Sequence, residues 1–335
     1  MGSCNNGLLQ HAQPCWHIEE GPIKKEIPEN DVQTALHWPS RPSDCVRGEA
    51  TLMPAIPFID THVHLWDPTR FTYPWLKDVP SIDRPHALPE FTAASAGLPL
   101  EGMVFMECDS DRAEALSEAL WIDSLAAQDP RLKGLVAFAP LENGGAVAAH
   151  LERLAAIPLV RGVRRLIQSE AEGFCLQAAF IDGARLLARF GFSFDICIRH
   201  PQLGEATAFA RQLPDIPMIL DHIGKPAIRD HLILPWADEM RELARLPHVM
   251  CKISGVATEA DSAHWTKDDL KRYVAIAIEA FGFDRVMFGG DWPVSTLAIS
   301  YPRWIEILDE LLAGVSTEEQ SKFWRGNAER FYRLA

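Results

Sequence analysis

The sequence predicts a (β/α)₈ barrel, because short apolar runs alternate with longer amphipathic segments between residues 55 and 335. Eight apolar runs occur there, and strands buried on both faces of a parallel sheet carry such continuous apolar character. Segments of helical period separate the runs, which is typical of parallel strands joined by crossover helices. An open doubly wound sheet is the alternative, but no GxGxxG motif follows an early strand.

The expected elements follow in chain order. The strands are AIPFID, EGMVFME, LKGLVAFAP, LVRGVRRLI, FSFDICIR, IPMILDH, HVMCKIS and DRVMFGG. The clearest helical patterns are RAEALSEALWIDSLAAQ, AVAAHLERLAAI, LQAAFIDGARLLARF, GEATAFARQL, ILPWADEMRELARL and LKRYVAIAIEAFG. No helical pattern begins between FTYPWL and residue 90, so a long loop is expected after the first strand. Residues 1–54 lack a sustained hydrophobic period, which predicts an irregular N-terminal extension before a barrel domain over 55–335.

Charge and composition limit the classes of partner. The formal net charge is −14, from 32 basic and 46 acidic residues, so neither nucleic acid nor an anionic membrane is an expected partner. No apolar stretch is long enough to span a bilayer, and no secretory signal is apparent, which together favour a cytoplasmic location. Seven cysteines without a CxxC pair indicate buried free thiols. We expect a small-molecule substrate, with a homo-oligomer left open.

Polar side chains follow nearly every expected strand, at the end of the barrel where such folds carry their chemistry. In chain order these residues are His62 and His64, Glu107, Arg164 and Arg165, Arg199 and His200, Asp221 and His222, Lys252, and Asp291. His62 and His64 are two residues apart, so on a regular strand both imidazoles point the same way. By the same alternation, Asp221 should point away from His222 and hold structure.

Three histidines and an aspartate at one mouth suit hydrolysis at a carbonyl. Neutral imidazoles and a carboxylate can hold one divalent ion, for which Zn²⁺ is the expected choice. His62, His64, His222 and Asp291 are then the ligands. Without a metal, the same groups can polarise a carbonyl oxygen and take a proton from water. Asp291 is the expected general base in both versions, and the sequence does not decide between them.

Several motifs together resemble the amidohydrolase superfamily. They are FIDTHVHLWDP, YPWL, VRGVRR, FDICIRHPQL, ILDHIGKP, CKISGVATEA and RVMFGGDWPV, and the resemblance extends from about residue 56 to about residue 333. More narrowly, they are similar to its branch of sugar lactonases and related lactone hydrolases. The resemblance implies a barrel and catalytic roles for His62, His64, His222 and Asp291. The residues of the fourth strand are arginines, which cannot form a carbamylated bridge, so a two-metal centre is not expected.

The resemblance also implies which residues meet the substrate. Arg164 and Lys252 are expected to line the pocket, since Arg164 and Arg165 point to opposite faces of a regular strand. Lys252 has the alternative of pairing with Asp291 or Glu107. Glu107 is a candidate pocket residue, metal ligand or partner for an arginine. His200 precedes Pro201 and has the alternative of a turn residue. Trp75 is expected to stack on the substrate, with ordinary packing as the alternative.

The expected activity is hydrolytic opening of a sugar-acid lactone such as an L-fucono- or L-rhamnono-lactone. Water activated by Asp291 would attack the ring carbonyl, which the histidine cluster or one divalent metal would polarise. Two alternatives remain. One is hydrolysis of a carboxylated or sulfonated lactone from aromatic degradation, and several arginines at the mouth would favour it. The other is an inactive barrel that only binds a ligand.

Overall fold

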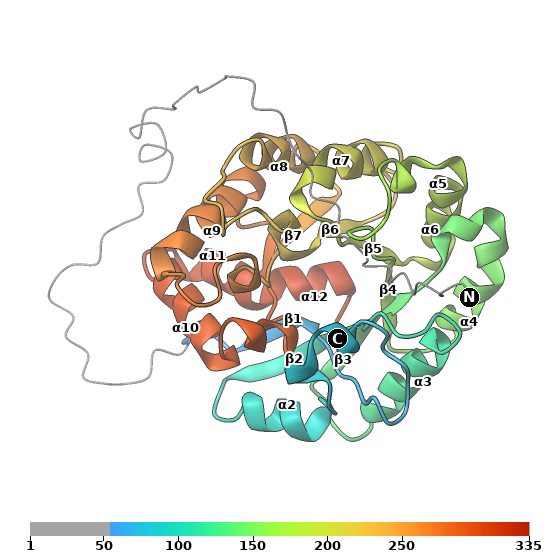
Figure 1. The fold of residues 1–335 in the computed structure, drawn as a ribbon, viewed down its shortest axis with the longest axis horizontal. Coiled ribbons are helices and arrows are strands. Elements are labelled where there is room, and N and C mark those ends of the chain that lie inside the picture. The colour runs from blue at the N-terminus through green and yellow to red at the C-terminus, as the bar shows by residue number, and fades with distance from the viewer. Residues whose placement is uncertain (1–53, 335) are drawn as a thin grey trace, which may run out of the picture. The chain divides into compact units, whose positions relative to one another are not determined.

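The fold is that of a computed structural model, which describes residues 54–334. The expected extension over residues 1–54 therefore lies outside the described residues, apart from its last position. The described residues contain an eight-stranded parallel sheet whose order is β1-β2-β3-β4-β5-β6-β7-β8 (Figure 1). This order confirms the predicted barrel, with helices packed around the outside of the strands.

All eight predicted strands are present where the apolar runs place them. Their bounds are β1 Phe58–Val63, β2 Leu100–Met106, β3 Leu132–Phe138, β4 Val160–Arg164, β5 Ser193–Ile196, β6 Met218–Leu220, β7 Val249–Ile253 and β8 Val286–Phe288. Every residue of β1, β5, β6, β7 and β8 is buried, and so is all but one residue in each of β2, β3 and β4. Burial on both faces explains why the strands read as apolar runs rather than as alternating patterns.

The helices follow the strands around the barrel. The α-helices are α2 Leu88–Ala94, α3 Ala115–Leu125, α4 Ala148–Ala155, α5 Ala178–Arg185, α6 Leu187–Phe190, α7 Leu203–Arg211, α8 Trp236–Ala244, α9 Lys267–Phe281, α10 Tyr301–Leu312, α11 Thr317–Ser321 and α12 Asn327–Tyr332. The long loop expected after β1 is present and contains two short 3₁₀ turns, Leu76–Asp78 and Pro80–Ile82. The described part of the chain contains no helix long and apolar enough to cross a membrane.

The barrel closes between its first and last strands. Val63 and Trp292 form an isolated parallel bridge. The backbone N–H of Asp291 donates to the carbonyl of His62 at 2.8 Å, and the N–H of His64 donates to the carbonyl of Trp292 at 2.8 Å. The seam therefore joins the HxH segment directly to the segment that carries Asp291.

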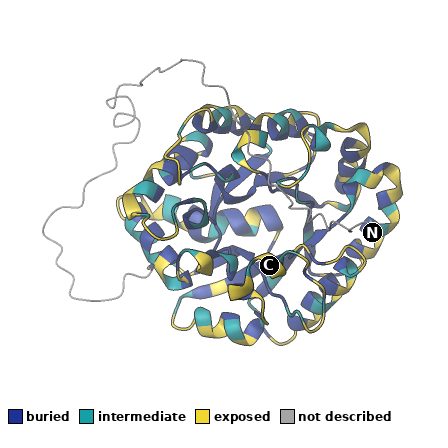
Figure 2. Cartoon of the chain, viewed as in Figure 1, coloured by how far each residue is buried: buried dark blue, intermediate teal, exposed yellow. Residues whose placement is uncertain are grey.

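Two apolar layers fill the fold. The larger layer packs the outer faces of the strands against the helices, whose yellow exposed faces point outward in Figure 2. The smaller layer fills the inside of the barrel and includes Ile59, Val136 and Met287 together with Tyr332 of α12. Figure 1 shows α12 lying across the middle of the barrel. Cys108, Cys175, Cys197 and Cys251 are buried free thiols, as predicted.

The outer layer allows a test of the packing. Phe194 on β5 is fully buried, and its ring lies 5.5 Å from that of Phe209 on α7. Phe194→Ala should lower the free energy of unfolding by about 3–5 kcal/mol, because it removes a large side chain and leaves a cavity. Leu120→Ala is the matched control on α3, because Leu120 is 53% exposed and should change stability by less than about 0.5 kcal/mol. Urea denaturation of both variants measures the difference, and equal losses would contradict the packing described.

Candidate active site

A shift in strand register aims both histidines of the HxH motif into the barrel. Asp60 pairs with Met103 and Val63 pairs with Phe105, so β1 contains one extra residue relative to β2 between these points. Ile59 faces the inside of the barrel in the lower layer. Strict alternation would then turn His62 outward, and the extra residue reverses that alternation. His62 and His64 consequently face inward together, with ring centroids 5.0 Å apart.

Asp291 lies between the histidines. Its Oδ1 is 3.5 Å from Nε2 of His64 and 3.8 Å from Nε2 of His62, and its Oδ2 is 4.0 Å from Nδ1 of His222. Asp291 has φ 55° and His222 has φ 54°, so both follow their strands in left-handed turns rather than as strand residues. The structure thus brings together the four residues that the sequence predicted as the centre of the site.

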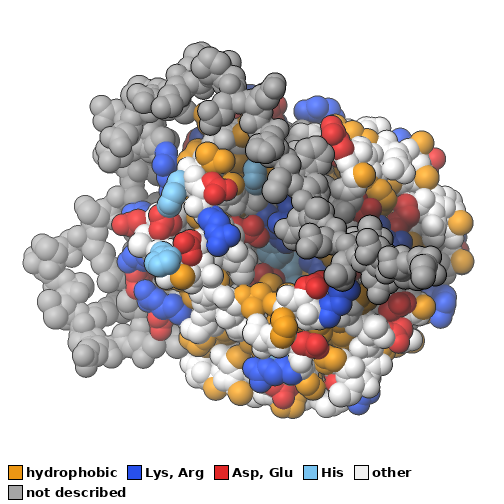
Figure 3. Space-filling view, viewed as in Figure 1, with side chains coloured by type: hydrophobic (Ala, Val, Ile, Leu, Met, Phe, Trp, Pro, Cys, Tyr) orange, Lys and Arg blue, Asp and Glu red, His pale blue; other side chains and the backbone are white. Residues whose placement is uncertain are grey.

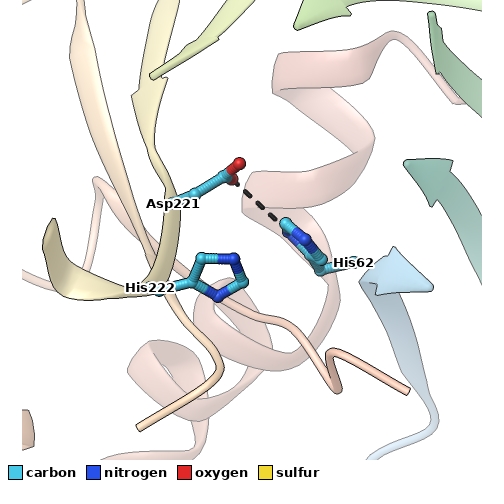
Figure 4. A group of neighbouring side chains, drawn as sticks. All are labelled: His62, Asp221 and His222. Carbon is cyan, nitrogen blue, oxygen red and sulfur yellow. Dashed lines mark ion pairs between the residues drawn. The ribbon is translucent and has the colours of Figure 1, made fainter. Parts of the chain in front are cut away.

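Each histidine has a partner on Nδ1 that fixes its ring. Nδ1 of His64 lies 2.9 Å from the carbonyl oxygen of Met106. Nδ1 of His62 lies 3.4 Å from Oδ1 of Asp221. Figure 4 marks this ion pair with a dashed line. Ser254 Oγ is 3.0 Å from Nδ1 of His222. With a proton on Nδ1, His62 and His64 each keep a bare Nε2 directed at Asp291, which is the usual arrangement of histidines that bind a metal or accept a proton.

Two buried cations lie against this cluster. Arg164 Nη1 is 3.4 Å from Nε2 of His62, and Arg164 Nε donates to Glu107 at 2.6 Å. Lys252 Nζ is 3.5 Å from Nδ1 of His62 and forms ion pairs with Asp195 at 2.5 Å and Asp221 at 3.0 Å. Both cations are therefore held by carboxylates before any ligand enters.

Burial and these charges set the protonation states of the cluster. Burial lowers the pKa of His62 well below its usual value, and burial lowers that of His222 to about 4. Burial alone would raise the pKa of Asp291, but the nearby histidines outweigh it and hold that pKa well below its usual range. At neutral pH His62 and His222 are neutral and Asp291 is a carboxylate, which are the forms that bind a cation or accept a proton.

The donor atoms suit one divalent ion. They form two overlapping groups, one of His62, His64 and Asp291 and one of His62, Asp221 and His222, each with ligand atoms within 4.8 Å of one another. Ligands about 2.1 Å from a zinc ion lie about 3.4 Å apart in a tetrahedron, close to the separations of the first group. The buried charge also fits. Four carboxylates surround two cations here, Glu107, Asp195, Asp221 and Asp291 around Arg164 and Lys252, an excess of two negative charges.

A cavity of about 340 Å³ opens above the cluster. Its wall consists of His64, Trp75, Val79, Cys108, Asp109, Arg164, Leu166, Gln168, Ser169, Cys197, His222, Lys225, Thr258, Glu259, Asp291, Val294 and Leu297. These residues come from the loops after most of the strands, as expected at the carboxyl end of a barrel. Trp75 is on the wall as predicted, held by a hydrogen bond from its Nε1 to the carbonyl of Cys108 at 2.8 Å.

Four expectations need correction. Lys252 and Glu107 are buried and do not line the cavity. Lys252 pairs with Asp195 and Asp221, while Glu107 pairs with Arg164, which agrees with its alternative as the partner of an arginine. His200 lies outside the cavity wall, in the 3₁₀ turn His200–Gln202, which agrees with its alternative as a turn residue. Asp221 does not point away from the site. Since β6 ends at Leu220, strand alternation no longer applies at Asp221, and its carboxylate contacts His62.

Gly255 is a site residue that the sequence interpretation missed. It has φ 58°, and a Cβ there would lie 2.6 Å from Nδ1 of His222 and 2.9 Å from Oδ2 of Asp291. A side chain at this position would therefore push apart two residues of the cluster. The signal was present in the sequence, because a glycine directly after an apolar strand often marks a close approach of the backbone to a site.

The whole barrel matches one protein family. A family model described as Amidohydrolase matches residues 59–334. The chain belongs to this amidohydrolase family. The family resemblance inferred from the motifs is therefore confirmed.

The curated relatives of this amidohydrolase with stated activities include two different lactone hydrolases. The L-fucono-1,5-lactonase of Burkholderia multivorans is 30% identical over 295 residues, which cover 82% of this chain and 96% of the relative. The 4-sulfomuconolactone hydrolase of Rhizobium radiobacter is 25% identical over 240 residues, which cover 70% of this chain and 75% of the relative.

Solved structures agree with the family assignment. An amidohydrolase from Burkholderia multivorans with bound HEPES has a TM-score of 0.76 and 29% identity, covering 84% of this chain and all of that one. A second crystal form of an amidohydrolase from the same organism contains bound zinc and has a TM-score of 0.75 with the same identity and coverage.

Gly255 offers a test of the cluster's geometry. Gly255→Ala should lower the hydrolytic kcat by about 100-fold, because displacement of catalytic groups by about 1 Å has effects of that order. Gly97→Ala is the matched control, since Gly97 also has a positive φ of 77° but no atom within 4 Å of its added Cβ. Both variants share the cost of backbone strain, and only Gly255→Ala adds overlap with His222 and Asp291. A comparable loss of kcat in both would contradict a specific role for Gly255.

Proposed function

We propose that this amidohydrolase opens lactone rings, with sugar-acid lactones as substrates. The observation that carries the proposal is the position of Asp291, a buried carboxylate held between three histidines at the base of a cavity of about 340 Å³. A cavity of this size suits a single small ring. The activities of the two curated relatives, which both act on lactones by name, support the same reaction class.

Asp291 acts as the proton carrier in this mechanism. Its carboxylate accepts a proton from a water molecule, whose oxygen attacks the carbonyl carbon of the lactone. When the tetrahedral intermediate collapses, the bond between the carbonyl carbon and the ring oxygen breaks. Asp291 returns the proton to the ring oxygen, which leaves as the hydroxyl of the product hydroxy acid. No proton or electron is gained or lost beyond those of water and lactone.

The negative charge that develops on the carbonyl oxygen needs a positive environment. His222 and Arg164 reach the cavity wall, and Arg164 is a permanent cation. Glu107 and Asp221 hold the guanidinium in place, so it need not reorganise during the reaction. His62 lies behind the wall and supports the other groups from below.

We also propose that His62, His64, His222 and Asp291 hold one divalent ion, with zinc as the best fit. The excess of buried negative charge and the spacing of the first donor group support this, as does the zinc in a related structure. When bound, the ion supplies Lewis-acid polarisation of the substrate oxygen. Arg164 provides a fixed positive charge beside His62 in either metal state.

The hydrolysis of sulfonated or carboxylated lactones is the second candidate, and the 4-sulfomuconolactone hydrolase relative favours it. Lys225 on the cavity wall is a cation with which an anionic group could pair. Among residues 54–334, the wall does not carry the several free arginines expected for such a substrate, because the arginine that lines it there, Arg164, is already bound to Glu107 and Asp221. The neutral sugar lactone therefore remains the better fit.

Substrate turnover tests the proposal directly. Proton release measured over a panel of sugar-acid lactones should reveal hydrolysis by the full-length protein. Asp291→Asn should lower kcat by about 10²–10⁴-fold, as expected for loss of a general base. The control Asp83→Asn removes an exposed carboxylate of the first loop and should leave kcat unchanged. Absence of turnover on all lactones would favour the binding-only barrel, and turnover restricted to sulfonated lactones would favour the second candidate.

Metal removal tests the second part of the proposal. The purified protein should contain up to one equivalent of zinc, and chelation should remove both the zinc and most of the activity. Activity should return when zinc is added back, since neutral histidines and an ionised Asp291 are ready to bind it. Full activity of the chelated, metal-free protein would instead assign carbonyl polarisation to His222 and Arg164 alone.

A further inference from the structure

One carboxylate on the cavity wall has no role in the mechanism above. Glu259 ends the short turn Ala257–Glu259, which follows β7 through Ser254 and Gly255. Its backbone is fixed on both sides, because its N–H donates to the carbonyl of Val256 at 3.3 Å and its own carbonyl accepts from Arg229 at 3.0 Å. The loops after β6 and β7 therefore hold Glu259 at a defined position on the wall.

The side chain of Glu259 is polar, half-buried and unpaired within the described residues. No hydrogen bond or ion pair joins its carboxylate to any residue of 54–334. Burial raises its pKa, while Lys225 and Arg199 oppose that rise. An acceptor that is partly removed from water without a protein partner is a favourable position for a ligand's donor groups.

The neighbouring wall groups are also polar. Lys225 donates a hydrogen bond to Gln168, and both residues line the same cavity. Lys225 is thus occupied by a neutral amide instead of a carboxylate. Asp109 follows β2 and adds a second carboxylate to the wall, for which no side-chain partner is found in residues 54–334. Apart from Asp291, the described part of the wall contains two carboxylates, Glu259 and Asp109. Its one cation without a carboxylate partner among the described residues is Lys225.

We propose that Glu259 is a specificity residue that binds hydroxyl groups of a neutral polyhydroxylated lactone and repels lactones that carry an additional negative charge. The inference rests on the proposed lactone hydrolysis and assigns the choice among lactones to a named side chain. A carboxylate accepts hydrogen bonds from two adjacent hydroxyls, which a sugar ring provides and a simple lactone does not. A carboxylated or sulfonated ring would instead place like charges together in a partly dry cavity.

A pair of matched substrates isolates this effect. Galactonolactone and galactarolactone differ by a terminal CH₂OH in the first and a carboxylate in the second. We expect the wild-type protein to hydrolyse galactonolactone with a kcat/KM at least about tenfold higher, as one unscreened like-charge contact would produce. Glu259→Gln keeps the shape and an acceptor oxygen but removes the charge. It should reduce this preference by about tenfold, mainly through the KM of galactarolactone.

Two further variants complete the test. Glu259→Ala removes the acceptor as well, so it should raise the KM of galactonolactone while leaving that of unsubstituted δ-valerolactone unchanged. Asp261→Asn is the control, because it removes the same charge from the same loop at a position outside the cavity wall. It should behave as the wild-type protein does. Glu259 and Gly255 variants can also be compared for thermal unfolding to exclude misfolding.

The outcomes separate the two proposals. If the wild-type protein hydrolyses no lactone, the proposed function fails before specificity is tested. If it hydrolyses both lactones and neither Glu259 variant changes the ratio of their kcat/KM values, the role of Glu259 is overturned and lactone hydrolysis stands. A wild-type preference for galactarolactone would overturn the inference without any variant, and this measurement decides it even if the Glu259 variants do not fold.

Discussion

The site depends on the seam that closes the barrel. Two backbone hydrogen bonds cross it, one from the N–H of Asp291 to the carbonyl of His62 and one from the N–H of His64 to the carbonyl of Trp292, each 2.8 Å long. The proton acceptor and the two histidines of the HxH motif are therefore placed by the same contacts that complete the sheet. A parallel sheet that is left open would have unpaired edge groups at this point. Closure satisfies the edges and sets the distance between Asp291 and its histidines in one step.

Close packing around the seam keeps this geometry rigid. Asp60 accepts hydrogen bonds from the N–H of His62 at 2.9 Å, from Gly290 at 2.8 Å and from the hydroxyl of Tyr301 at 2.7 Å. One carboxylate thereby ties β1, the loop after β8 and α10 together. A Cβ on Gly290 would lie 2.3 Å from this carboxylate, so only glycine fits. The GG pair before Asp291 is thus a packing requirement of the seam.

The strands and the central residues could be predicted from the sequence because both rest on local patterns. A strand buried on both faces must be apolar, and a polar residue at its carboxyl end then stands out. His62, His64, His222 and Asp291 were found in this way, and the structure brings them together. Local sequence patterns do not predict the path of the backbone after a strand ends.

The errors have that same origin. Asp221 and His222 were assigned to opposite faces by alternation, but the strand ends at Leu220 and His222 has a left-handed φ, so both side chains lie next to His62. Lys252 was expected on the cavity wall, yet its partners are Asp195 on β5 and Asp221 directly after β6, and contacts between separate segments leave no mark in a single sequence. Gly255 shows the opposite case, where the signal was present but its meaning depends on two side chains far away in the sequence.

The buried charges connect the chemistry at the mouth with the packing at the base. Tyr332 of α12 donates to Asp195 at 2.7 Å, Asp195 pairs with Lys252, and Lys252 pairs with Asp221, which contacts His62. Burying ions is costly unless each ion is paired, so this series of buried ion pairs contributes little to the stability of the fold. The series instead fixes the orientation of the His62 ring, because every residue in it has a defined partner and the ring has little freedom to rotate. The helix α12, which fills the inside of the barrel, therefore forms the base of the site. Through Tyr332 it fixes the positions of the charged residues that lie between it and His62.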